Sequence, residues 1–269
     1  MLSLQIIMED IKGKVYFIAD CHFGLPNKAE SDVRERRVLS FLNSIENDVT
    51  HLFMLGDVFD FWFEYKDVVP RDYIRFIGKL AFLADKGVKI YYVLGNHDMW
   101  NFGYLEQEIG LKMLRGYHNF VINGLKVRLG HGDALDPQDK GYLLIKWIYS
   151  RKINQRLFAA LHPRWAFAIA RAVSLKSRNA HLAKDKYFWG EDSEPIIRYC
   201  RNILEKQHFD IFIFGHRHYP LDFALNENSR YLNVGDWQTH DTYVLMENEK
   251  CELKYYSSND ISNPTDADL

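Results

Sequence analysis

The chain has 269 residues and a formal net charge of −2, and 47% of its residues are hydrophobic and 26% charged. This composition is typical of a globular protein, and the length allows one large core, with or without an insertion, but not two full-size domains. No apolar run approaches the roughly 18 residues of a membrane span and no secretory signal is visible, so we expect a cytoplasmic protein. Three widely spaced cysteines argue against a disulfide framework.

The first half of the chain combines predicted strands with one clear helix. A helical pattern opens at Pro70 and ends at Gly87, because proline is common at the start of helices and glycine at their end. Apolar runs rich in aromatic and β-branched residues are typical of strands. They predict strands at residues 15–19, 52–55, 90–94 and 125–129.

The segment of residues 137–190 differs from the rest of the chain. It contains eleven lysine and arginine residues and only two aspartates, a net charge of +9, and it has no strand signal. Apolar residues recur in it at helical spacing, with an interruption at His162-Pro163. We interpret this segment as an inserted helical cap, and its charge predicts contact with an anion.

The last third of the chain returns to helix and strand. A helix is predicted from near Ser193 to Leu204, and it leads to a strand at residues 211–214. Further strands are predicted at residues 230–234 and 242–256, the second interrupted by a turn at 248–250. The order of elements predicts an α/β fold.

A short polar motif follows each of five predicted strands. Because open α/β sheets bind ligands outside the carboxyl ends of their strands, we expect the five motifs to lie at one edge. They are Asp20-Cys21-His22, Gly56-Asp57-Val58-Phe59-Asp60, Gly95-Asn96-His97-Asp98, Gly130-His131-Gly132-Asp133 and Gly215-His216-Arg217-His218.

Two of these motifs carry paired ligands. Asp20 and His22 are two residues apart, so both side chains leave the same face of the strand end and can hold one ion. His216 and His218 have the same spacing, and they either share one ion or divide between two. In all, four histidines, two aspartates and one asparagine are candidate ligands, a set that suits Mn²⁺, Fe or Zn²⁺ better than Ca²⁺.

The remaining ligands suggest a second ion. Asp57 is a natural bridge, because one carboxylate can place an oxygen on each of two metals. Asn96 and His131 would complete the second site. Two metals about 3.5–4 Å apart support in-line displacement at phosphorus without a protein nucleophile. The motifs therefore predict a two-metal phosphoesterase centre.

Two further motif residues suit proton transfer. His97 is expected beside the scissile phosphate, as a cation or as the general acid for the leaving oxygen. Asp60, three residues after Asp57, is expected to orient His97 by accepting its other ring proton.

The ordered pattern D-x-H, GD-x-x-D, GNH[DE], GH and GH-x-H, complete from Asp20 to His218, resembles that of the calcineurin-like metallophosphoesterases. The resemblance implies a mixed-sheet αββα sandwich with an inserted helical cap. It also implies the role of each motif residue: one metal on Asp20, His22, Asp57 and His218, the other on Asp57, Asn96, His131 and His216, with His97 catalytic and Asp60 supporting it.

Within that superfamily, the stretch from Gly56 to Trp62 and the sequence His131-Gly132-Asp133 followed by a basic cap are similar to the UDP-2,3-diacylglucosamine hydrolases of lipid A biosynthesis. This resemblance implies cleavage of the substrate pyrophosphate to UMP and 2,3-diacylglucosamine 1-phosphate at the inner membrane surface. It implies two divalent ions, with Mn²⁺ first and Fe, Zn²⁺ or Mg²⁺ as alternatives. The expected division is a core of residues 1–136 and 191–269 with a cap of residues 137–190.

The same resemblance implies contacts between the cap and the substrate. Asp139 and Tyr142 match family positions near the sugar, and Arg171 and Ser174 match the start of the family's cap motif R-x-x-S-x-x-x-N-x-x-K. The chain departs from the family pattern at Arg178 and His181, where the family's cap motif has asparagine and lysine.

Alternative functions differ from this one mainly in the cap. A soluble phosphoesterase acting on nucleotides or other nucleoside diphosphate conjugates would use the same metals. A nucleic-acid enzyme or binding protein would use the basic cap as a phosphate track, but the negative net charge and the lack of a stacking module count against it. The lipid interpretation assigns an acyl groove, rather than the cap's own core, to Trp147, Ile148, Phe158, Trp165 and Phe167.

Overall fold

The computed structural model describes residues 9–181 and 187–257. The strands are β1 (Glu9–Ile11), β2 (Val15–Ile18), β3 (His51–Met54), β4 (Lys89–Val93), β5 (Lys112–Leu114), β6 (His118–Ile122), β7 (Leu125–Gly130), β8 (Ile211–Phe214), β9 (Leu221–Asn226), β10 (Ser229–Asn233), β11 (Thr242–Glu247) and β12 (Lys250–Tyr255). The helices are α1 (Lys28–Ile45), α2 (Ile74–Asp85), α3 (Tyr104–Ile109), α4 (Lys140–Ser150), α5 (Lys152–Ala159), α6 (Pro163–His181) and α7 (Pro195–Leu204).

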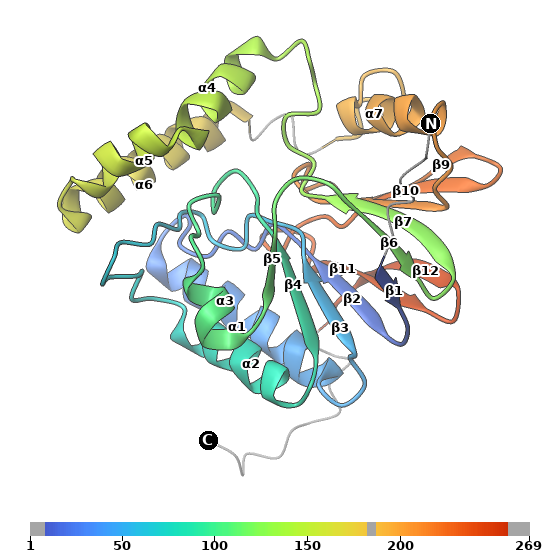
Figure 1. Ribbon diagram of the computed structural model, residues 1–269, viewed down its shortest axis with the longest axis horizontal. Coiled ribbons are helices and arrows are strands. Elements are labelled where there is room, and N and C mark those ends of the chain that lie inside the picture. Colours follow the sequence, from blue (N-terminus) through green and yellow to red (C-terminus); the bar gives the residue numbers. More distant parts are fainter. Residues whose placement is uncertain (1–8, 182–186, 258–269) are drawn as a thin grey trace, which may run out of the picture.

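Two mixed six-stranded sheets form the centre of the molecule (Figure 1). One sheet has the order β12-β11-β2-β3-β4-β5 and the other β1-β6-β7-β8-β10-β9. Apolar residues from both sheets share one buried cluster, which includes Phe17, Phe53, Phe120 and Val127. β2 and β8 are buried along their whole length because they are covered on both faces, and this explains their unbroken apolar sequences.

Helices cover the outer faces of the two sheets. α1 and α2 lie against the sheet of β2, β3 and β4, where Phe41 and Leu80 join a second buried cluster. α7 covers the other sheet (Figure 1), and its Ile196, Ile197 and Cys200 pack with Phe212 and Phe214 of β8. The layers therefore run helix, sheet, sheet, helix, and the predicted αββα sandwich is confirmed.

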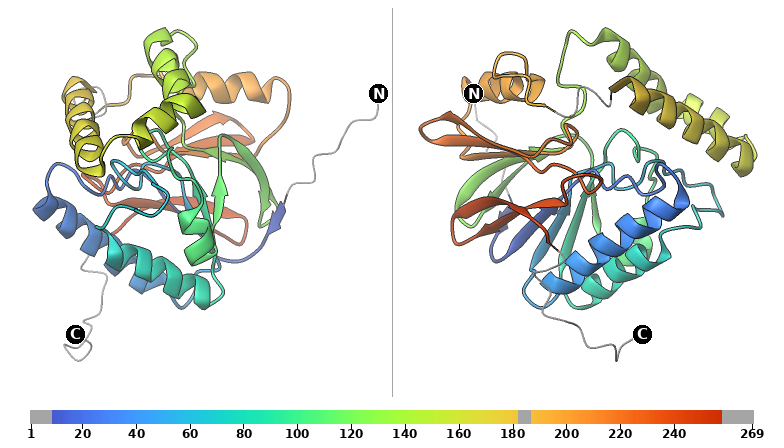
Figure 2. Two further views of the ribbon diagram at one scale, coloured as in Figure 1. Left: turned by 60° about the vertical axis from the view of Figure 1, so that its left-hand side comes forward. Right: turned by 180° about the vertical axis from the view of Figure 1, so that it is seen from behind.

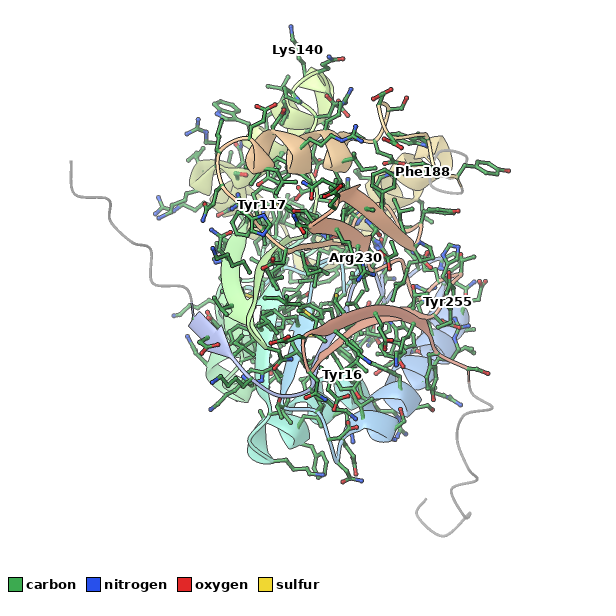
Figure 3. The ribbon with its side chains drawn as sticks, turned by 90° about the vertical axis from the view of Figure 1, so that its right-hand side faces the viewer. Tyr16, Tyr117, Lys140, Phe188, Arg230 and Tyr255 are labelled. Atoms are coloured by element: carbon green, nitrogen blue, oxygen red, sulfur yellow. The ribbon has the colours of Figure 1, made fainter. Side chains whose placement is uncertain are left out.

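The cap helices α4, α5 and α6 lie beyond one end of this sandwich (Figures 1 and 2). No residue of α4 or α5 is buried, and Lys140 at the start of α4 points outward at the tip of the molecule (Figure 3). The cap contacts the core through aromatic rings. The centroids of Phe158 and Phe167 lie 5.9 and 5.3 Å from that of Phe61.

The predicted elements agree with the structure except at one helix start. The predicted strands are present to within one or two residues at each end, and the interruption at His162-Pro163 separates α5 from α6. The helix expected to open at Pro70 instead begins at Ile74, because Tyr73 has a φ of 67° and so cannot continue a right-handed helix backward. Within the described ranges, no helix is long and apolar enough to cross a membrane. The three cysteines are buried free thiols.

Candidate metal centre

The five motifs lie together because the two sheets present the same ends of their strands at one edge of the sandwich. β2, β3 and β4 are mutually parallel in one sheet, and β7 and β8 are parallel in the other. Each of these five strands is followed in the chain by one of the five motifs. Side chains from distant parts of the sequence therefore meet, as the hydrogen bond from the His216 amide to Asp20 Oδ2 at 2.7 Å illustrates.

The first group of ligands consists of Asp20, His22 and His218. Asp20 Oδ1 lies 3.5 Å from His22 Nε2 and 3.3 Å from His218 Nε2, and the two ring nitrogens are 3.2 Å apart. Asp20 is fully buried, and its Oδ1 has no hydrogen-bond partner among the described residues. A buried carboxylate oxygen that accepts no hydrogen bond is costly, so this group fits a bound cation.

The second group consists of Asp57, His131 and His216, with Asn96 beside it. His131 Nε2 lies 3.3 Å from Asp57 Oδ2 and 3.1 Å from Asn96 Oδ1. The same Asp57 oxygen is 3.8 Å from His22 Nε2 of the first group. Asp57 therefore reaches both groups, as a bridging ligand must, and the set of donors suits two divalent ions.

The backbone of the ligand loops is held in an unusual conformation. Asp20, His22, Asp57, His216 and His218 have φ angles between 44° and 69°, in the left-handed region that residues with a side chain seldom adopt. Such strain is concentrated at functional sites and persists only where the surroundings enforce it.

Two motif glycines allow the loops to approach each other. A Cβ at Gly95 would lie 2.2 Å from Asp57 Oδ1, and a Cβ at Gly215 would lie 2.6 Å from Asp20 Oδ2. Neither position therefore accepts a larger residue without displacing a metal-ligand candidate.

His97 lies beside the second group and contacts Asp60 through one side of its ring. Its Nδ1 donates to the Asp60 carbonyl oxygen at 2.9 Å and lies 3.4 Å from the Asp60 carboxylate. The predicted contact thus exists, but the backbone oxygen of Asp60 is the nearer acceptor. Burial alone would lower the pKa of His97, but Asp57 and Asp60 raise it to about 9. An imidazolium here can donate its Nε2 proton to a leaving oxygen.

Opposite charges also perturb the ligands themselves. Burial would raise the pKa of Asp57, yet the neighbouring His131 and His97 lower it well below its usual range. Asp57 in turn raises the pKa of His131 to about 10, against the effect of burial. Burial and the proximity of His131 lower the pKa of His216 to about 3. Large opposing shifts of this kind mark functional sites.

Sequence reasoning missed two carboxylates that support the ligand loops. Asp98 is fully buried and accepts from the backbone N–H groups of Val58 and Gly95, at 2.9 and 2.8 Å. Asp236 Oδ2 lies 3.6 Å from Nδ1 of His218, where a carboxylate can orient a metal-binding imidazole. Gly235-Asp236 follows the predicted strand at 230–234, so the pattern that revealed Asp57 could also have revealed Asp236.

Arg217, between the two histidines of the last motif, was also missed. Its guanidinium forms a bidentate pair with the buried Glu194, both distances being 3.0 Å, and lies 3.8 Å from the centroid of the Trp189 ring. Trp189 and Glu194 belong to the stretch that leads back from the cap to α7. This ion pair therefore connects the loop of His216 and His218 to the segment between the cap and α7.

Three of the four predicted cap residues form hydrogen bonds within the protein, and the fourth is exposed. Asp139 caps α4 by accepting from the Tyr142 amide, while the Tyr142 hydroxyl donates to Asp133 at 2.7 Å. Ser174 donates to the Asp60 carboxylate at 2.8 Å and is buried. Arg171 is exposed. Their contact with substrate stays a prediction, and the side chains at 178 and 181 lie outside the described residues.

Comparison with known proteins agrees with this geometry. The sequence profile described as "Calcineurin-like phosphoesterase" matches residues 13–220. The chain belongs to the calcineurin-like phosphoesterase family. It is therefore a hydrolase of a family whose members use divalent metals, and the Asp and His groups described above are where those metals fit.

Two relatives of this phosphoesterase carry the same name. A protein of Porphyromonas gingivalis named UDP-2,3-diacylglucosamine hydrolase is 34% identical, and the match covers 88% of this chain and 95% of that protein. The protein of the same name from Haemophilus influenzae is 26% identical, with coverage of 89% and 97%. The solved structure of an archaeal phosphodiesterase has 13% identity and a TM-score of 0.46, covering 90% of this phosphoesterase and 99% of that chain.

Proposed function

We propose that this phosphoesterase hydrolyses the pyrophosphate of UDP-2,3-diacylglucosamine and releases UMP and 2,3-diacylglucosamine 1-phosphate. The single observation that carries the proposal is the 34% identity to a protein of that name across nearly the whole length of both chains. A match of this extent includes the cap segment as well as the metal centre, so it bears on the substrate and not only on the chemistry.

The metal ions of the proposed reaction are two Mn²⁺, with Fe, Zn²⁺ or Mg²⁺ as alternatives. Asp20, His22 and His218 would hold one, His131, His216 and Asn96 the other, and Asp57 both. When bound, the pair supplies an activated hydroxide and charge stabilisation at phosphorus. His97, held by Asp60, donates a proton to the leaving phosphate oxygen.

The proposed lipid substrate suits the surface of the cap, which we take to be residues 137–190. Trp147 and Trp165 are 54% and 66% exposed, and Ile148 beside Trp147 is also exposed. Arg151 lies over the Trp147 ring, 4.1 Å from its centroid, so a cationic group stands directly beside an exposed apolar ring on this surface. Such a surface suits acyl chains together with anionic head groups at the inner membrane surface.

The aromatic residues expected to line an acyl groove therefore fall into two sets. Phe158 and Phe167 pack against Phe61 of the core, as described above, and they anchor the cap. Trp147, Ile148 and Trp165 are exposed to solvent instead, and we assign these three residues to the binding of the acyl chains.

A substrate comparison tests the proposal. Protein loaded with Mn²⁺ should hydrolyse UDP-2,3-diacylglucosamine far better than UDP-N-acetylglucosamine. The paired change Trp147→Glu with Ile148→Glu should sharply weaken hydrolysis of the diacylated substrate, because each buried methylene contributes about 0.8 kcal/mol. Hydrolysis of bis(p-nitrophenyl) phosphate should be spared.

A matched control is Val33→Glu with Ile74→Glu, two exposed apolar residues of α1 and α2 outside the cap. This variant should treat both UDP compounds as the wild type does. Equal cleavage of the two compounds by the wild type would refute the lipid substrate and favour a phosphoesterase of soluble nucleotide conjugates.

A further inference from the structure

A cavity of about 660 Å³ opens between the core loop of residues 60–73 and the cap helix α6. Asp60 lines this cavity, and the Asp60 carboxylate accepts from Ser174 of α6. The cavity therefore starts beside the candidate proton donor His97, which contacts the same Asp60. Val68, Val69 and Phe167 supply apolar walls.

Three arginine residues from two parts of the fold line the cavity. Arg71 comes from the core loop, and Arg164 and Arg171 come from α6. The two helical arginines are seven residues apart, so they lie on the same side of α6, two turns from each other. Among the described residues, no carboxylate pairs with any of the three side chains.

The other polar groups of the cavity do not offset this charge. The hydroxyl of Tyr73 has no hydrogen-bond acceptor within the described residues and is a further available donor. Both carboxylates in the lining have partners elsewhere, since Asp60 binds Ser174 and Asp72 lies 3.8 Å from Lys28 Nζ. The lining thus has three arginines against two carboxylates, so it keeps a net positive charge in addition to the Tyr73 hydroxyl donor.

We propose that this cavity is a binding site for a phosphate-type anion attached to an apolar or planar group, held by Arg71, Arg164 and Arg171. Guanidinium groups are suited to phosphate oxygens because they donate two parallel hydrogen bonds. The proposal rests on the proposed function, because it takes a pyrophosphate as the substrate. Such a substrate has two phosphates, and the metal centre would bind one of them. The cavity beside His97 can receive the half of the substrate that carries the other.

A phosphate anion with an apolar part can come from a nucleotide or from the head group of an anionic lipid, and two measurements distinguish them. The first is inhibition of bis(p-nitrophenyl) phosphate hydrolysis by UMP, with the full chain loaded with Mn²⁺. The second is sedimentation with phosphatidylcholine vesicles, with and without phosphatidylglycerol. Both compare the wild type with Arg71→Gln/Arg164→Gln and with the control Arg36→Gln, which removes an exposed charge on α1.

If the anion is a nucleotide phosphate, the inhibition constant of UMP should rise about tenfold in the double variant, with vesicle binding unchanged. If it is a lipid head group, the double variant should lose its phosphatidylglycerol-dependent sedimentation while the UMP constant stays the same. A double variant that matches Arg36→Gln in both measurements would overturn the proposal. Neither measurement uses UDP-2,3-diacylglucosamine, so failure to cleave that lipid would refute the proposed function alone.

Discussion

His97 is the residue whose surroundings bear most directly on the chemistry. It contacts Asp60 and forms, with His22 and Asp60, a third cluster of side chains that could hold an ion, but it belongs to neither metal set that we propose. His97→Ala should therefore keep both metals and lower kcat by about 10²–10⁴-fold, the usual loss for a positioned acid or base. Metal content by mass spectrometry and the rate of phosphodiester hydrolysis check this.

The exposed His208 offers a control for that experiment. His208→Ala removes an imidazole on the surface and should change neither metal content nor rate. Loss of metal from His97→Ala in parallel with its activity would make His97 a ligand and contradict the role given to it.

At this scale the sequence predicted which candidate ligands the structure brings together, but not the residues that support them. Residues two apart at a strand end must share a face, so Asp20 and His22 could be paired from spacing alone. The bond from Ser174 to Asp60 joins residues 114 positions apart in the sequence, and no local pattern foretells it. The preference of His97 for the backbone oxygen of Asp60 likewise depends on the fold.

At the scale of elements, the pair of Glu194 and Arg217 joins the last ligand loop to the segment returning from the cap. Both side chains are buried, so Arg217→Met would leave the Glu194 carboxylate with the Trp189 amide but without a positive charge beside it, and should destabilise the fold by about 3–5 kcal/mol. The same change should weaken metal binding by His216 and His218. Thermal unfolding and the Mn²⁺ dependence of activity measure the two effects.

The exposed pair of Arg201 and Glu191 is a matched control, and Arg201→Met should cost no more than about 1 kcal/mol. Removing both charges in Glu194→Gln with Arg217→Met should recover part of the lost stability, because no buried charge is then unpaired. An Arg217→Met protein as stable as Arg201→Met, with unchanged Mn²⁺ dependence, would contradict this account.

The helix α1 shows why some elements escaped prediction. Its buried face contains Ser31, Arg34 and Glu35 as well as apolar residues, so the apolar stripe is interrupted in the sequence. Arg34 is buried because it donates to the backbone oxygens of Cys21 and His22, at 3.0 and 2.7 Å. The residue that obscures the helix thus supports the first ligand loop.

For the molecule as a whole, the important feature is that both sheets deliver ligands to one edge. The sequence predicted that edge, since each motif follows a strand. It could not assign the strands to their sheets, because β7 and β8 pair with each other and otherwise with β6 and β10, and no metal motif follows β6 or β10. Asp57 at the end of β3 and His131 at the end of β7 meet only through the packing of one sheet on the other.

The central claim is a pair of ions joined by Asp57, and the metal content of an Asp57→Ala variant tests it most directly. We expect the wild type, loaded with Mn²⁺ and freed of excess metal, to retain two ions per chain and hydrolyse its substrate. Asp57→Ala should stay folded, retain at most one ion and lose activity, because the carboxylate that reaches both ligand groups is gone. Two retained ions with near-normal turnover in that variant would contradict the claim.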